Sequence, residues 1–98
     1  MRPISVDIKK STKPEKKFMA VFSFEDGKTK TVHFGAAGYS DFTKHKDEAR
    51  KKRYIERHER HEDWSDPMTP GALSRYILWN LETLQESITD YKVRFKLK

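Results

Sequence analysis

The stretch of sequence that decides the fold runs from residue 54 to residue 95 and consists of three segments. They read Tyr-Ile-Glu-Arg-His (54–58), Trp-Ser-Asp-Pro-Met-Thr-Pro-Gly-Ala-Leu-Ser-Arg-Tyr-Ile-Leu-Trp-Asn (64–80) and Ser-Ile-Thr-Asp-Tyr-Lys-Val-Arg-Phe (87–95). Two prolines and two helix-start signals stand among both tryptophans and three of the four tyrosines. Such an ordered series of helix-breaking and helix-capping residues predicts a defined tertiary unit.

The middle segment predicts a short helix over residues 70–81. Asp66-Pro67 ends the preceding helix, because the residue before a proline is pushed out of the α region. Thr69 is the expected N-cap, and Pro70 stands at the first helical position, where its missing N–H costs nothing. This helix is apolar nearly all round, which predicts a central position or an interface. We expect a homodimer, with these interface residues: Tyr76, Leu78 and Trp79.

The last helix is predicted from a capping box. Thr83 and Glu86 stand at the spacing in which each side chain satisfies a free N–H at a helix start. The residues that then recur at helical spacing are Leu84, Ile88, Tyr91 and Phe95. They predict one buried face on this helix.

Residues 46–62 predict a charged helix with no Gly or Pro, capped by Asp41 or Thr43. Its basic residues are the candidate nucleic-acid contacts, with lysines 9, 10, 13, 16 and 17 able to extend them. These candidates are Arg50, Lys51, Arg53, Arg57 and Arg60. The four arginines form one stripe that could follow a phosphate backbone. Pairing of the stripe with Glu56 and Glu59 is the open alternative.

The first third of the chain predicts β structure. Residues 18–24 and 29–34 flank Asp26-Gly27, a pair suited to the positive φ angles of a tight hairpin turn. Residues 1–17 predict an edge strand, from the alternation at 4–8, followed by a flexible loop. The glycine-rich segment 35–40 is expected to break the second arm and to connect the hairpin to the helices.

Composition limits the classes of protein that fit. The chain has 98 residues, which predicts one domain over 1–98, and it has no cysteine, which excludes disulfides and thiolate metal sites. Neither a signal-peptide core nor a run long enough to insert into a membrane is evident. A net charge of +6 and a pI near 9.6 favour polyanionic partners.

Chemistry at a catalytic or metal site is not predicted. His58 and His61 share a helical face, but three-residue spacing without a distant ligand cluster favours an ordinary solvated or packed pair. A hydrolase arrangement of scattered His and Asp residues has no supporting motif. We therefore expect no enzyme activity, no catalytic residues, no metal and no cofactor.

The order of motifs in residues 38–97 resembles a family of small basic proteins encoded by nucleocytoplasmic large DNA viruses, the giant viruses of amoebae and algae. The shared pattern is Tyr-Ile-x-Arg-His, then Asp-Pro-x-Thr-Pro-Gly-Ala-Leu-Ser-Arg-x-Ile-Leu-Trp-Asn, then Ser-Ile-x-Asp-Tyr-x-x-Arg-Phe. The resemblance implies a viral origin and a location in the virion, the host cytoplasm or the viral factory. It implies no biochemical activity.

Together these patterns predict an α+β fold, in which a β-hairpin or small antiparallel sheet packs against about three helices. The predicted function is a non-enzymatic viral binding or packaging protein that contacts the phosphate backbone of DNA or RNA. The alternative is a virion structural or host-interaction protein that acts through self-association and protein contacts.

Overall fold

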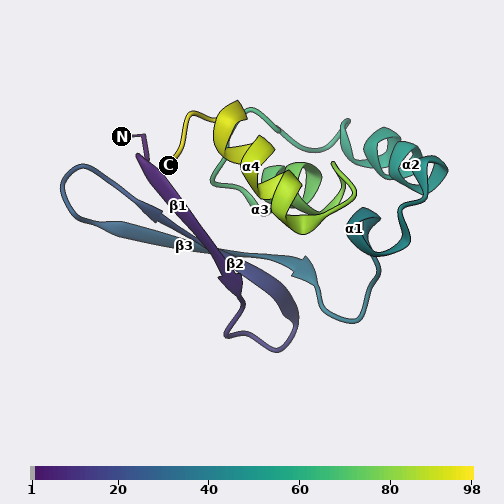
Figure 1. The fold of residues 1–98 in the computed structure, drawn as a ribbon, viewed down its shortest axis with the longest axis horizontal. Helices are drawn as coiled ribbons and strands as arrows, with labels where there is room; N and C mark the ends of the chain where they lie inside the picture. Colours follow the sequence, from purple (N-terminus) through teal and green to yellow (C-terminus); the bar gives the residue numbers. More distant parts are fainter. Residues whose placement is uncertain (1) are drawn as a thin grey trace.

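A computed structural model describes residues 2–98 of the chain. A three-stranded antiparallel sheet in the order β1-β2-β3 comes first, and the helices follow it and gather on one side of the sheet (Figure 1). The elements are β1 (Ser5–Lys10), β2 (Lys16–Ser23), β3 (Thr29–Ala36), α1 (Phe42–His45), α2 (Glu48–His58), α3 (Pro70–Leu73), η1 (Ser74–Leu78) and α4 (Leu84–Arg94). The predicted α+β fold is confirmed.

The sheet follows the alternation of its sequence. Phe18 pairs with Phe34 and Ala20 pairs with Val32, which directs these side chains to one face. Phe22 and Phe34 are fully buried on that face. Gly27 adopts the positive φ of 85° that the predicted Asp26-Gly27 turn requires. The hairpin arms are longer than predicted: the second arm does not end at residue 34 but continues to Ala36.

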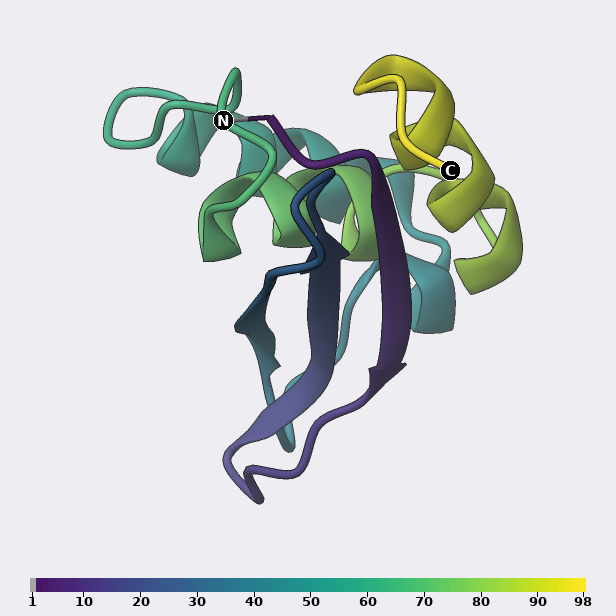
Figure 2. The same ribbon diagram turned by 90° about the vertical axis from the view of Figure 1, so that its left-hand side faces the viewer.

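The predicted edge strand is β1, which pairs with β2 along its whole length. The other end of the chain covers the start of its free edge, since the Val6 N–H donates to the Lys98 carbonyl at 3.0 Å and the Lys98 N–H donates to the Ile4 carbonyl at 3.1 Å. The view in Figure 2 shows the C-terminus returning beside the start of β1. The segment predicted as a flexible loop is a hydrogen-bonded turn, in which the Lys16 N–H donates to the Lys13 carbonyl at 3.1 Å.

The helix predicted over residues 46–62 is α2, which is shorter at both ends, and a separate short helix, α1, precedes it. Lys46 separates them because it adopts a left-handed φ of 54°, which ends α1. Asp41 caps α1, and Asp47 caps α2 by accepting from the Ala49 N–H at 3.0 Å. The predicted caps of the long helix were therefore wrong: Asp41 belongs to another helix, and Thr43 lies inside it.

The helix predicted over residues 70–81 changes its geometry halfway. Thr69 caps α3 as predicted, accepting from the Ala72 N–H at 3.2 Å, and Pro70 occupies the first turn. Beyond Leu73 the turn widens into the π-helix η1, where the Trp79 N–H donates to the Ser74 carbonyl at 3.0 Å. The chain then leaves the helix at Trp79, two residues before the predicted end.

The core lies between the sheet and the C-terminal helices. Leu73, Ile77 and Tyr91 are completely buried there, and the Tyr91 hydroxyl donates to the Pro67 carbonyl at 2.6 Å. Thr83 caps α4, although the Glu86 carboxylate accepts from the Thr83 hydroxyl instead of the backbone N–H of a full capping box. Within residues 2–98, no helix combines the length and apolar character needed to span a membrane.

Candidate functional site

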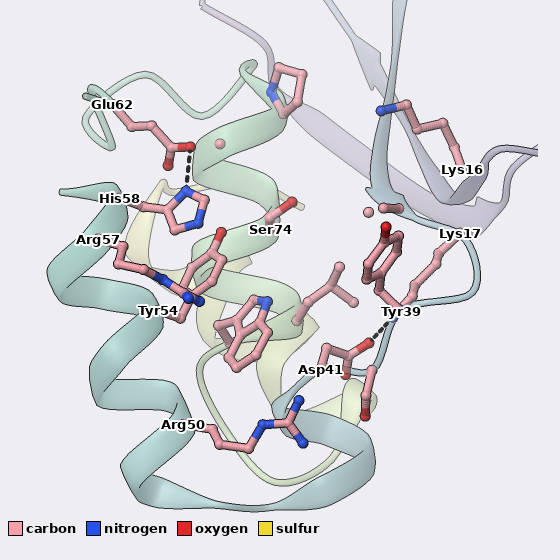
Figure 3. Close-up of a pocket in the computed structure, with 17 residues that line it drawn as sticks. Lys16, Lys17, Tyr39, Asp41, Arg50, Tyr54, Arg57, His58, Glu62 and Ser74 are labelled. Carbon is pink, nitrogen blue, oxygen red and sulfur yellow. Dashed lines mark hydrogen bonds and ion pairs between the residues drawn. The ribbon is translucent and has the colours of Figure 1, made fainter. Parts of the chain in front are cut away.

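An open groove of about 540 Å³ separates the sheet from α2. One wall is formed by the start of β2, the end of β3 and the loop after β3, and the opposite wall is the face of α2 (Figure 3). Residues of α3, η1 and the turn after η1 form the floor, among them Gly71, Leu78 and Trp79. The volume falls in the range of small-molecule and cofactor sites.

A buried ion pair anchors the sheet side of this groove. The Lys17 ammonium lies 2.5 Å from an Asp41 carboxylate oxygen, and the two side chains are only 10% and 2% exposed. The second oxygen of Asp41 accepts from the Thr43 N–H at 3.0 Å and from the Thr43 hydroxyl. Asp41 is thus already neutralised and hydrogen-bonded by the protein itself.

The second carboxylate of the groove, Glu62, also has partners within the protein. Glu62 accepts from the Trp64 indole N–H at 2.7 Å, and its other oxygen lies 3.1 Å from His58 Nδ1. Gly71 faces this carboxylate so closely that a Cβ at that position would lie 3.0 Å from it. Glu62 is therefore fixed by its neighbours.

Three cationic side chains line the groove without such partners. Arg50 and Arg57 project from α2, and Lys16 comes from the first residue of β2. Arg50 and Arg57 are exposed. In the part of the chain that the structure describes, no carboxylate lies within ion-pair distance of any of the three. The groove thus has an excess of positive charge.

Aromatic rings complete the helix side of the groove. The Tyr54 ring stacks on Trp79 at a centroid distance of 4.4 Å and on His58 at 4.1 Å. Tyr54 is 7% exposed, and its burial raises the pKa of the phenol far above the ordinary value of 10. The phenol is therefore neutral under ordinary conditions. Across the groove, Tyr39 leaves 73% of its surface exposed.

The predicted basic stripe is divided by the structure. Only Arg50 and Arg57 line the groove, whereas Arg53 is exposed outside it and Arg60 lies in the turn beyond the end of α2. No ion pair within residues 2–98 joins these arginines to Glu56 or Glu59. The internal pairing left open by the sequence is thus not present.

Lys51 has a structural position. Its ammonium donates to the Asn80 carbonyl at 3.0 Å, lies 3.3 Å from Glu48 and stands 4.4 Å above the Phe42 ring. These contacts tie α2 to α1 and to the turn after η1. They also leave Lys51 outside the groove.

The predicted interface residues are largely covered by the chain itself. Leu78 is 2% exposed, and its Cδ1 would lie 2.8 Å from a Cβ at Gly35. Leu78 is therefore a core residue, and its assignment to an exposed interface was wrong. Tyr76 and Trp79 are partly buried against the core. The sheet and α4 thus cover much of the apolar surface that led us to expect a second copy.

Arg75 lies among aromatic side chains and is held by a hydrogen bond to the backbone. Its guanidinium donates to the Trp79 carbonyl at 2.9 Å and lies 5.5 Å from the Trp64 ring. Burial lowers the pKa of Arg75, although a guanidinium remains charged in proteins. Arg75 has no carboxylate within ion-pair distance in residues 2–98, and the nearby Asp90 lies 3.3 Å from Arg94 and accepts from the Asn80 amide at 2.7 Å.

The histidines do not form a metal centre within residues 2–98. No group of three or more His, Asp or Glu side chains lies close enough together to hold an ion there. His58 stacks on Tyr54 and contacts Glu62, as described above, and His61 is exposed in the turn after α2. His33 contacts the Ser11 hydroxyl at 2.8 Å.

Sequence reasoning missed Tyr39, the most exposed aromatic residue of the groove. Its signal was weak, because Tyr39 follows Gly38 in a segment that reads only as a connection. Reasoning from spacing also missed the Lys17–Asp41 pair, whose members stand 24 positions apart.

Comparison with known proteins identifies a family. A family model described as "Family of unknown function (DUF5754)" matches residues 6–58, just over half of the chain. The match covers nearly all of the sheet together with α1 and α2, including both arginines of the groove, whereas the motifs of residues 64–95 lie beyond it. No curated protein and no solved structure matches the chain. The chain belongs to the family of unknown function DUF5754.

Proposed function

We propose that this protein is a non-enzymatic nucleic-acid-binding protein and that its groove takes the phosphate backbone between Arg50, Arg57 and Lys16. The observation that supports the proposal is that, within residues 2–98, the carboxylates of the groove are paired and three of its cations are not. Both carboxylates of the groove have partners within the protein, while the three cations have no carboxylate partner in residues 2–98. Such cations gain most from phosphate, because binding releases the counterions of the nucleic acid.

The spacing of the two arginines suits a chain of phosphates. They stand seven positions apart, or about 10 Å along the axis of α2. At that separation the two guanidiniums contact different phosphates of one strand. Each guanidinium presents a planar fork of N–H donors that matches a phosphate group.

A viral setting is part of the proposal. The ordered motifs of residues 54–95 resemble small basic proteins of nucleocytoplasmic large DNA viruses, and genome binding or packaging fits a basic groove. We place the protein in the virion and in the cytoplasm or viral factory of the infected host. Immunogold labelling of infected cells and purified particles tests this location.

Two double variants with the same loss of charge test the function. Arg50→Gln with Arg57→Gln empties the groove of two cations, and Arg53→Gln with Arg60→Gln removes two exposed arginines outside it. Binding to labelled DNA is measured by fluorescence anisotropy over a salt series. The groove variant should flatten the logarithmic salt slope by about 0.7–0.9 per lost contact, whereas the control should leave the slope close to that of the parent.

Equal weakening by both variants would show that only net charge matters, and the groove would lose its role. A parent protein that binds no nucleic acid at low salt would end the proposal. Circular dichroism checks that α2 stays folded, because glutamine is nearly as good a helix former as arginine.

The alternative, a virion structural or host-interaction protein, is favoured by the free edge of β3. No strand pairs with the outer side of β3 in the described chain, whereas Lys98 covers the start of the outer side of β1. An unpaired edge can accept a strand from a second copy or another protein. Light scattering at rising concentration tests self-association. A dimer should dissociate when Thr31 is replaced by Pro, which cannot donate a backbone hydrogen bond.

A further inference from the structure

Tyr39 has an unusual setting for an aromatic residue of a small protein. It follows Gly38, which has a φ of 87° and open space around it, in the loop between β3 and α1. With 73% of its surface exposed, Tyr39 contributes little to the core. No ring of the described chain stacks on it.

The position of Tyr39 relative to the cations is specific. Figure 3 shows it on the sheet side of the groove, next to Lys16 and Lys17 and across from Arg57 on α2. A ligand in the groove therefore meets a free aromatic face on one side and cations on both sides. Proteins that bind single strands combine these two features, an aromatic platform for a base and a positive track for the backbone.

The state of the bases decides between a duplex and a single strand. In a duplex each base is already stacked on its neighbours, so its face is not available to Tyr39. An unpaired base has a free face and can stack on any exposed ring, whatever its sequence. Phosphate contacts alone need no such ring.

We propose that the groove binds single-stranded nucleic acid, with one unpaired base stacked on Tyr39 and the adjoining phosphates held by Arg50, Arg57 and Lys16. This inference rests on the function proposed above and makes it more specific. Whether the sugar is ribose or deoxyribose is an outcome of the test.

The first experiment compares the strands. A labelled mixed-sequence oligonucleotide is prepared as single-stranded DNA, as single-stranded RNA and as a duplex with its complement, and each form is titrated with the protein. The single strands should bind more tightly than the duplex at equal salt. Inorganic polyphosphate, which has charge but no bases, should be a weaker competitor than the unlabelled single strand.

The second experiment changes the platform. Tyr39→Ala should weaken single-strand binding about 5- to 150-fold, which corresponds to the loss of one stacked base. Tyr39→Phe keeps the ring and should keep the affinity, whereas Tyr39→Leu keeps an apolar side chain without the ring and should behave like alanine. Because Tyr39 is exposed, the melting temperature of all three variants should stay close to that of the parent.

The two proposals fail separately. If the duplex binds as tightly as the single strand and Tyr39→Ala changes neither, the stacking inference is overturned. In that case the loss caused by Arg50→Gln with Arg57→Gln still supports phosphate binding. If no nucleic acid binds with salt dependence, both proposals are overturned.

Discussion

The ring of Tyr54 lies flat on the ring of Trp79, with centroids 4.4 Å apart and planes inclined by only 3°. Tyr54 belongs to α2, and Trp79 follows η1, so the stack joins the helix wall of the groove to its floor. The position of Arg50 and Arg57 relative to the rest of the groove therefore depends on this contact.

Replacing Trp79 by alanine should lower the free energy of unfolding by about 3 kcal/mol. This is the lower end of the range for large aromatic residues, because Trp79 is only partly buried. Urea denaturation followed by circular dichroism measures the change. Trp79→Phe keeps a ring for Tyr54 and should cost less, and an alanine variant as stable as the parent would show that the stack has no structural role.

Gly35→Ala should destabilise the fold more than Gly27→Ala. Both glycines have positive φ angles, 80° and 85°, which are unfavourable for alanine. A Cβ at Gly35 would in addition lie 2.8 Å from the buried Leu78 side chain, whereas a Cβ at Gly27 meets nothing within 4 Å. We expect a loss of about 1 kcal/mol at Gly27 from backbone strain. The loss at Gly35 should be about 1–3 kcal/mol larger, and equal melting temperatures would contradict this close packing.

Lys17→Met should cost about 3–5 kcal/mol, because it leaves the buried Asp41 without its cation. Adding Asp41→Asn removes the unpaired charge, so the double variant should be more stable than the sum of the single effects predicts. The coupling free energy is obtained from the four denaturation curves of this cycle. Simple additivity would mean that the two charges do not interact.

His45 should make the protein less stable in mild acid. Burial first, and the nearby Arg50 second, lower the pKa of His45 below 6.5, while Asp47 and Asp41 oppose them. The unfolded chain therefore takes up a proton before the folded chain does. The contribution of neutral His45 to the free energy of unfolding is complete above about pH 6.5. It is lost as the pH falls through the lowered pKa that His45 has in the folded protein.

The pH effect is read from melting temperatures at pH 7 and pH 5. The decrease in the parent should be larger than in His45→Gln, which has no titrating ring. His61→Gln removes an exposed histidine and should behave like the parent. A decrease of the same size in all three proteins would assign the acid sensitivity to other groups.

Local chemistry explains which features could be predicted from the sequence. The turn at Asp26-Gly27 and the caps Thr69 and Thr83 were predicted because each depends on residues within a few positions. The short helix α1 and its end at Lys46 could not be predicted, because a lysine in a left-handed conformation has no sequence signal.

The groove could not be predicted because it forms between distant parts of the chain. Arg50 and Arg57 were identified as candidates from helical spacing, but so were Arg53 and Arg60, and only the packing of α2 on Trp79 separates the two pairs. The assignment of Leu78 to an interface failed for the same reason. A sequence shows that a helix is apolar on every side but does not show how much of it the sheet covers.

The wide turn of η1 also has a consequence for how this segment tolerates changes in length. A π turn contains one residue more than an α turn, and each residue of a helix advances the next by about 100°. Deleting a single position between Ser74 and Leu78 should convert the wide turn into an α turn and leave Trp79 close to its present direction on Tyr54, because either turn carries the chain about once around the helix axis. The extra residue should thus make this segment tolerant of a one-residue deletion, whereas the same deletion in a regular α-helix would rotate Trp79 by about 100° and separate the floor of the groove from its helix wall.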